Sequence, residues 1–315
     1  MILKTFLYII FISNKLCFSQ NITTTVNFYE EPSWVPRVVN GKPAKLGDVP
    51  YQVALKALVN RYRRIYMTFC GATIVAETKL LTAAHCFEGG NSCEKLLNPG
   101  KATKAAIKNK AAVAGNLRNR LAYVTSDSED GQWRSIHSVY FPKSYKFPKH
   151  DIAVAFLNRP FRYTSYIGPI PMASQNTDYH GKCLVSGYGR TGQSRLAQTE
   201  VLLLANLEIM PKKYCNKVHH KYMDDFVCTS SAFTDVGKGD SGGPLVCANT
   251  GDPNDKGKGV LVGVVSGHSR GRGSFFTRVS KYSRFIKASK SQTVSMFKYH
   301  SGTYMVIITM TTIYK

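Results

Sequence analysis

Three separate motifs contain the residue types that nucleophilic catalysis by a serine hydroxyl requires. Such chemistry needs an attacking hydroxyl, a base that takes its proton, an acid that orients the base, and donors for a developing oxyanion. Gly239-Asp240-Ser241-Gly242-Gly243-Pro244 sets a serine among glycines, which let a turn aim neighbouring N–H groups at one point. Leu81-Thr82-Ala83-Ala84-His85-Cys86 supplies a histidine. Asp151 begins an apolar strand, where its carboxylate would be partly buried and would need a partner.

Each motif taken alone has an ordinary structural explanation. A glycine-rich serine loop is usually a turn, a single histidine is more often structural, and an aspartate at a strand start commonly bonds locally. The order His85, Asp151, Ser241 in one chain is far more specific than any of the three. We therefore interpret the motifs together, as parts of one site that the fold must assemble.

The elements that must position these residues are mostly short strands. From Val38 onward, β-rich runs recur between Gly and Pro turn signals, which is typical of an all-β barrel or sandwich. One helix is expected near the end, over Ser280 to Ala288, with Tyr282, Phe285 and Ile286 on one face. The clearest runs are Tyr51–Leu55, Ala72–Val75, Ile152–Phe156 and Gly259–Val265.

The three motifs and one further segment closely resemble the trypsin/chymotrypsin family of serine proteases. The segments are Cys70-Gly71-Ala72, Thr82-Ala83-Ala84-His85-Cys86, Asp151-Ile152-Ala153 and Gly239-Asp240-Ser241-Gly242-Gly243-Pro244. The resemblance covers about Val38 to Ala288. It implies an all-β fold of two six-stranded antiparallel barrels, with the active site in the cleft between them and a short C-terminal helix.

The same resemblance implies a role for each residue of the site. Ser241 would be the nucleophile, His85 the general base and acid, and Asp151 the carboxylate that orients it. Gly239 and Ser241 would supply the oxyanion hole, and Ser266 stands where the family has a serine that bonds the buried aspartate.

Eight cysteines agree with an oxidising destination. The family pattern implies three pairs; of the other two cysteines, Cys17 would leave with an N-terminal signal peptide, and Cys93 is then left over. The implied pairs are Cys70 with Cys86, Cys183 with Cys247, and Cys215 with Cys228.

The start of the domain resembles the family's activation site. Pro36-Arg37-Val38-Val39-Asn40-Gly41 implies a zymogen that a second protease cuts after Arg37. The freed Val38 amine would pair with the buried carboxylate of Asp240 and order the oxyanion hole.

The specificity pocket follows the family only in part. Asp235 falls where trypsin-type members carry the aspartate that selects Arg or Lys, and Lys238 lies at the cleft edge. A family cysteine is replaced by Gly237, and the rim Ser266 to Phe276 is short, with Gly267 and His268 in unusual places. Ser274 is expected to replace a wall glycine and to narrow the slot, so we expect altered trypsin-like cleavage.

The ends of the chain lie outside this resemblance. Lys4 followed by the apolar run Phe6–Ile12 predicts a signal peptide and a secreted, extracellular protein. We expect a signal peptide over 1–19, an activation propeptide over 20–37, a protease domain over 38–289 and an extension of unknown role over 290–315. Neither the first segment nor the apolar stretch of the tail is long enough to predict a membrane span.

The chain is strongly basic, with 42 Lys and Arg against 19 Asp and Glu and a formal charge of +23. Two basic loops predict an exosite for an acidic protein or polyanion on the leaving-group side of the cleft, although scattered solubilising charge explains them equally well. One loop precedes Cys70 and the other follows His85. The second loop belongs to residues 91–110, which we predict to be a solvated insertion. The residues concerned are Arg61, Arg63, Arg64, Lys101, Lys104, Lys108 and Lys110.

Two functions from different classes therefore remain open. The first is a monomeric secreted serine endopeptidase that acts on protein or peptide substrates and needs no cofactor. The second is a catalytically weak or inactive homologue that binds partners through its basic surface. Asp127, Glu129 and Asp130 lie near where some relatives hold calcium, but their spacing fits poorly and favours an exposed acidic turn.

Overall fold

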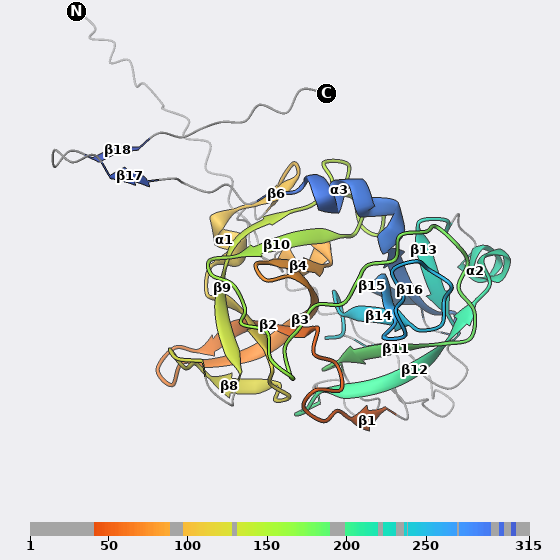
Figure 1. Cartoon of the computed structure of the whole chain (residues 1–315), viewed down its shortest axis with the longest axis horizontal. Coiled ribbons are helices and arrows are strands. Elements are labelled where there is room, and N and C mark those ends of the chain that lie inside the picture. The colour runs from red at the N-terminus through yellow and green to blue at the C-terminus, as the bar shows by residue number, and fades with distance from the viewer. Residues whose placement is uncertain are drawn as a thin grey trace, which may run out of the picture.

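The computed structural model describes residues 41–88, 97–127, 131–189, 199–219, 223–230, 236–237, 239–269, 271–290, 296–298 and 304–306. The chain folds into two closed antiparallel barrels, one from each half of the described sequence (Figure 1). The predicted all-β fold of two six-stranded barrels is therefore confirmed.

The first barrel is closed by the antiparallel pairing of β9 with β10, which joins the two ends of its ring of strands. Its ring order is β10-β4-β3-β2-β7-β9, and three short strands, β5, β6 and β8, are attached to its edges. The six ring strands are β2 (Gln52–Asn60), β3 (Ile65–Ala76), β4 (Lys79–Thr82), β7 (Lys110–Ala114), β9 (Gln132–Tyr140) and β10 (Ala153–Leu157). The attached strands are β5 (Leu97–Asn98), β6 (Lys101–Ala102) and β8 (Arg120–Ala122).

The second barrel closes through the pairing of β12 with β13. Its ring order is β12-β11-β14-β15-β16-β13, and the short strand β1 (Lys42–Pro43) adds to β12 from outside. The ring strands are β11 (Lys182–Gly187), β12 (Leu203–Met210), β13 (Phe226–Thr229), β14 (Pro244–Cys247), β15 (Val260–Ser269) and β16 (Gly273–Arg278). Two further strands, β17 (Met296–Lys298) and β18 (Tyr304–Val306), pair with each other.

Helices are short in the described part of the chain. The expected C-terminal helix is present as a 3₁₀ turn, η2 (Val279–Tyr282), followed by α3 (Ser283–Ala288), and Ile286 is its buried anchor. The other helices are η1 (Ala84–Phe87), α1 (Lys104–Ile107) and α2 (Lys212–His219).

The interpretation of residues 91–110 as a solvated loop is wrong for its described part. Residues 97–110 contain β5, β6 and α1, and Ala102 and Ala106 are buried against the first barrel. Thr103 caps α1 by accepting the N–H of Ala106. The Lys-rich composition hid this element because only its small alanines face inward.

The buried apolar side chains form two main clusters, and the larger one extends from the first barrel across the seam between the barrels to Leu204, Val246 and Leu261 of the second. The first barrel is filled by side chains such as Leu55, Ile74 and Val154, and the second by side chains such as Val185 and Leu207. Alternating β-branched and leucine side chains place one face of each strand inside, which is why the short β-rich runs were readable in the sequence.

Close backbone contact and a buried polar pair are among the contacts that make the seam. A Cβ on Gly71 of β3 would lie 2.8 Å from the Cα of Gly243, so only glycine lets the barrels approach this closely. Beside it, the Ser186 hydroxyl donates to the Gln52 side chain at 2.6 Å, both residues being buried. The candidate site lies along this seam.

Candidate active site

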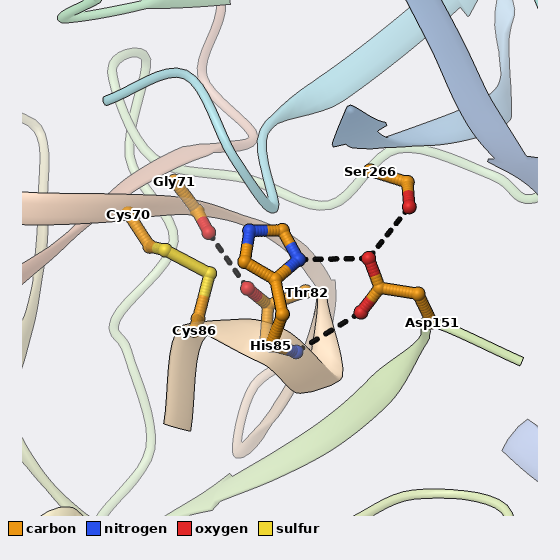
Figure 2. The surroundings of a disulfide bond; sticks show 7 residues. All are labelled: Cys70, Gly71, Thr82, His85, Cys86, Asp151 and Ser266. Atoms are coloured by element: carbon orange, nitrogen blue, oxygen red, sulfur yellow. Dashed lines mark hydrogen bonds and ion pairs between the residues drawn. A yellow bond between two sulfur atoms is a disulfide. The ribbon is translucent and has the colours of Figure 1, made fainter. Parts of the chain in front are cut away.

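His85 and Asp151 come from different parts of the first barrel and meet in two hydrogen bonds. The imidazole Nδ1 lies 2.7 Å from Asp151 Oδ2, and the backbone N–H of His85 donates to Oδ1 at 3.0 Å (Figure 2). The histidine lies in the turn η1, while the aspartate lies two residues before the buried strand β10. Asp151 is completely buried, and the His85 side chain keeps 21% of its exposure.

The second barrel also holds Asp151. The hydroxyl of Ser266 on β15 donates to Oδ2 at 2.6 Å, and Thr277 on β16 donates to the backbone carbonyl of Asp151 at 2.7 Å. The carboxylate therefore receives three donors from both barrels, which satisfies its burial. Figure 2 shows Ser266 and His85 approaching the same carboxylate from different sides.

This arrangement fixes how the imidazole can act. A carboxylate oxygen only accepts, so the proton of neutral His85 lies on Nδ1 and the lone pair lies on Nε2. The second ring nitrogen points away from Asp151 in Figure 2. His85 therefore presents a base on the side of its ring that faces away from the carboxylate.

The Ser241 loop of the second barrel packs against β3 and β4 of the first barrel. The carbonyl of Ser241 accepts the N–H of Gly71 at 2.7 Å, and Gly242 has a positive φ of 77°. A Cβ on Gly242 would lie 2.3 Å from Thr82 Oγ1, a hydroxyl that donates to the Gly71 carbonyl at 2.8 Å. The serine is thus held two residues along from the seam glycine Gly243 and close to the turn that carries His85.

The hydroxyl of Ser241 is not hydrogen-bonded to the imidazole of His85 in this structure. Among the described residues, no hydrogen bond joins the Ser241 side chain to His85. Catalytic hydrogen bonds of ligand-free sites are often long and tighten only with substrate. The N–H groups of Gly239 and Ser241 likewise donate to no other described residue, which leaves two donors on one turn available.

Asp240 is buried beneath this turn. Its carboxylate accepts the N–H of Gly189 at 2.6 Å and that of Gly237 at 2.8 Å, and the residue is 1% exposed. Gly187 and Gly189 bracket it so tightly that a Cβ on either would come within 2.0 Å of a carboxylate oxygen. Gly239, with φ of 115°, makes the turn that separates Asp240 from the residues before it.

The predicted specificity residues are only partly described. Asp235 and Lys238 lie outside the described residues, as do Arg37, Val38 and Cys93. Ser274 is fully buried on β16, and its hydroxyl accepts the N–H of Val236 at 3.4 Å. The ring of Phe275 fills the space over Gly267, where a Cβ would lie 2.3 Å from the ring. The rim is therefore packed by an aromatic side chain from the neighbouring strand.

Three disulfides join the pairs that the resemblance implied. Cys70–Cys86 links β3 to the turn bearing His85, and Cys183–Cys247 links β11 to β14 (Figure 2 shows the first). Cys215–Cys228 ties α2 to β13. The first pair fastens the histidine turn beside the strand that holds the Ser241 carbonyl.

Sequence reasoning missed one aromatic neighbour of the histidine and misread one acid. Phe147 is 48% exposed, and its ring lies edge-on to His85 with 5.5 Å between centroids, on the loop before Asp151. The prediction of an exposed acidic turn fails at Asp127, because Arg134 binds its carboxylate at 2.7 Å and Arg162 lies 3.2 Å away; Glu129 and Asp130 lie outside the described residues. These arginines hold the pKa of Asp127 below its usual value. No local sequence pattern predicts the contact of Phe147 with His85 or that of Asp127 with its arginines.

Two closed antiparallel barrels that share a His–Asp pair and a glycine-rich serine loop define the class of two-barrel serine proteases. The family model described as Trypsin matches residues 38–286, and the chain belongs to the trypsin family.

Curated relatives agree with this family. The chain is 30% identical to Transmembrane protease serine 7 of Mus musculus over 267 residues, which is 81% of this chain and 28% of that protein. It is 27% identical to Kallikrein-5 of Homo sapiens over 260 residues, 80% of this chain and 75% of the relative. The match to Transmembrane protease serine 9 of Rattus norvegicus, 29% over 235 residues, covers 73% of this chain and 19% of that protein. Within the described residues, no helix is long and apolar enough to cross a membrane.

Proposed function

We propose that this chain is a secreted serine endopeptidase, made as a zymogen and activated by cleavage after Arg37. The observation that carries the proposal is the buried Asp151, which receives the His85 ring at 2.7 Å and the Ser266 hydroxyl at 2.6 Å. Together they hold the imidazole base beside the Ser241 loop. The disulfides support an oxidising destination.

The proposed reaction uses these groups in two stages. Ser241 Oγ attacks the substrate carbonyl while His85 Nε2 takes its proton, and the imidazolium then gives that proton to the leaving amine. Water next attacks the acyl group in the same way, releasing the acid and restoring the hydroxyl. The N–H groups of Gly239 and Ser241 stabilise the oxyanion of each tetrahedral intermediate. Asp151 keeps the ring oriented and stabilises its charged form.

Activation would act through Asp240. Its buried carboxylate accepts the N–H groups of Gly189 and Gly237. We propose that a new ammonium at Val38 pairs with this carboxylate, and β1 begins only four residues later at Lys42. Burial of that ammonium would stabilise the turn that carries the Gly239 and Ser241 donors.

For substrate choice, we propose cleavage after Arg or Lys, with Asp235 binding the side chain. The support is the sequence position of Asp235 together with the neighbouring wall, where Ser274 contacts Val236. Because the Phe275 ring occupies the space over Gly267, we expect it to weaken the binding of the substrate residues that precede the cut.

One experiment tests the mechanism and the pocket together. The precursor is cut with trypsin, Val38 is verified as the new N-terminus, and the product is treated with a fluorophosphonate beside Ser241→Ala. Labelling of the wild type alone, with preference for Arg or Lys peptides, supports the proposal. Labelling with another preference overturns the pocket assignment, and no labelling of a folded, processed protein overturns the mechanism.

A basic exosite on the leaving-group side is the second part of the proposal. The turn that bears Arg61 and Arg63 lies beside the turn that bears Lys108, because the N–H of Leu58 donates to the Asn109 carbonyl at 3.0 Å. All three cationic side chains are exposed. Lys110 connects this surface to the site, since its ammonium lies 4.8 Å from the Phe69 ring and 5.3 Å from the Phe87 ring.

The exosite is tested with paired peptides that differ only in acidic residues after the cut. We expect faster cleavage of the acidic peptide, and we expect Arg63→Gln with Lys108→Gln to remove the difference. Lys256→Gln with Lys258→Gln, two exposed lysines in the loop before β15, serves as the charge-matched control. Equal rates for both peptides in the wild type would dismiss the exosite.

The alternative is a catalytically weak homologue that binds partners through its basic surface. The observation that favours it is the Ser241 hydroxyl, which makes no hydrogen bond to His85 among the described residues. The labelling experiment separates the two proposals, because a binding protein leaves Ser241 unlabelled after processing.

A further inference from the structure

Lys56 is a buried lysine that the proposed mechanism does not use. It lies on β2 with none of its surface exposed. Its ammonium donates three hydrogen bonds, to the Asn119 carbonyl at 2.6 Å, the Arg118 carbonyl at 2.8 Å and the Thr68 hydroxyl at 3.0 Å. No described carboxylate lies within ion-pair distance of it. A buried cation held only by neutral oxygens is unusual, because charge burial is costly without a partner.

The carbonyls that Lys56 holds belong to the segment where the first barrel touches the second. Asn119 donates its backbone N–H to Glu200 at 2.8 Å and its side-chain N–H to the Thr199 carbonyl at 2.7 Å. Leu202 donates to Leu117 at 2.8 Å. Lys56 therefore holds the segment 117–119 in place, and residues 199–202 dock on the second barrel's side by hydrogen bonds to this segment.

The docked segment leads directly to Asp240. The N–H of Thr199 donates to the Gly189 carbonyl at 3.4 Å, and the N–H of Gly189 donates to the Asp240 carboxylate at 2.6 Å. A second route passes through Tyr188, whose hydroxyl donates to Asn116 at 2.9 Å and whose ring centroid lies 5.5 Å from the Lys56 ammonium. Both routes end at the glycine that holds Asp240.

We infer that Lys56 is a positioning residue for the oxyanion-hole turn, acting through the 117–119 edge, Tyr188 and Gly189 on the carboxylate of Asp240. The inference rests on the proposed function for its catalytic consequence. Its structural content, a tie between β2 and the loop 187–189, stands independently of that function. A side chain without donors at position 56 frees two carbonyls and loosens the loop that brackets Asp240.

The chain provides a matched control in Lys79. This half-buried lysine of the same barrel also donates to a carbonyl, that of Ile286 at 3.1 Å, and lies 5.5 Å from the Phe156 ring. It ties β4 to the C-terminal helix and has no contact with the route to Asp240. Lys79→Met therefore removes a comparable lysine without touching the proposed tie.

The first test measures amide hydrogen exchange of Lys56→Met and Lys79→Met, each in a Ser241→Ala background. We expect exchange of residues 116–119, 187–189 and 199–202 to accelerate about tenfold or more in Lys56→Met only. Unchanged exchange in these segments, or equal acceleration in both variants, overturns the inference. This arm needs no catalytic activity and so remains decisive if the proposed function fails.

The second test uses activated enzyme that has passed the fluorophosphonate assay. We expect Lys56→Met to lower kcat about tenfold with little change in KM. We also expect it to weaken the binding of a peptidyl aldehyde inhibitor by a similar factor. The aldehyde's hemiacetal oxygen would occupy the oxyanion hole, so a merely less stable protein would not show this parallel loss. An unchanged kcat in folded Lys56→Met, or the same loss in Lys79→Met, would contradict the inference.

Discussion

Ser266 shows how one hydroxyl outside the three principal groups can set the geometry of the site. It donates to the carboxylate oxygen that His85 also uses, and it comes from the opposite barrel. Its loss leaves that oxygen one donor short inside a buried environment. Removing a hydrogen bond to a charged group typically costs about 1.5–3 kcal/mol.

We therefore expect Ser266→Ala to lower kcat/KM by roughly 10- to 100-fold, since each 1.4 kcal/mol is about a factor of ten. The measurement is peptide hydrolysis by processed enzyme at neutral pH. Ser289→Ala is the control, because that hydroxyl donates only to the Phe285 carbonyl on α3. Wild-type kinetics in folded Ser266→Ala would show that the hydroxyl does not orient the carboxylate.

Lys56 gives the stability of the protein a pH dependence of defined sign. Burial lowers the pKa of Lys56 to about 7. Between that pKa and the unfolded value of 10.5, the unfolded chain binds a proton that the folded protein lacks. The contribution of Lys56 to the unfolding free energy therefore rises with pH across this window, by up to about 1.4 kcal/mol per unit.

The measurement compares urea unfolding of the wild type and Lys56→Met at pH 7 and pH 9. We expect the wild type to gain stability relative to the variant as the pH rises. The difference between the two proteins cancels the titration of all other groups. A pH-independent difference would mean that Lys56 keeps its proton throughout this range.

At the scale of elements, the loop 187–189 is tightly constrained by Asp240. Gly187 ends β11, and a Cβ there would lie 2.0 Å from Asp240 Oδ1, so even alanine must displace the carboxylate. We expect Gly187→Ala to fold and to lose most fluorophosphonate labelling at Ser241. Gly168→Ala, where a Cβ meets no atom within 4 Å, should keep wild-type labelling. Near-UV circular dichroism checks that both variants are folded.

The disulfides should differ in how much they stabilise the protein. Cys183–Cys247 closes 64 residues, whereas Cys215–Cys228 closes 13. Loop-closure entropy assigns about 4 kcal/mol to the longer loop and about 3 kcal/mol to the shorter one. Replacing each pair by alanines and measuring the denaturant midpoint and slope should reproduce that order. The reverse order would indicate that strain or residual structure dominates the effect.

Whole-molecule charge leads to a prediction about salt. A net charge of +23 repels itself in the compact state, and this repulsion falls with ionic strength. We expect the unfolding free energy at pH 7 to rise as sodium chloride increases from low to physiological concentration. Sucrose at matched osmolality controls for general exclusion effects. A flat or falling response would show that local ion pairs, such as Arg134 with Asp127, outweigh the global repulsion.

The sequence predicted the strands and the meeting of His85 with Asp151 because both follow from short-range patterns. Apolar alternation marks a strand, and three motifs in a fixed order mark this family. It could not reveal Lys56, because a lysine in a β-rich run looks like any solvated charge until its acceptors on 118 and 119 are known. Asp127 was misread for the same reason, since its arginines come from β9 and beyond. Arg37 and Asp235 remain predictions.

The seam between the barrels has a consequence for how this protein could be switched off. His85 and Asp151 stand on one side of the Gly71–Gly243 contact, and Ser241 and Ser266 stand on the other. Neither barrel alone contains all four residues, so the candidate site is a property of their docking and not of either fold. A slip of about 1 Å along the seam would stop the proposed hydrolysis while both barrels stayed intact. An inhibitor that wedges the barrels apart at this joint would therefore act without filling the specificity pocket.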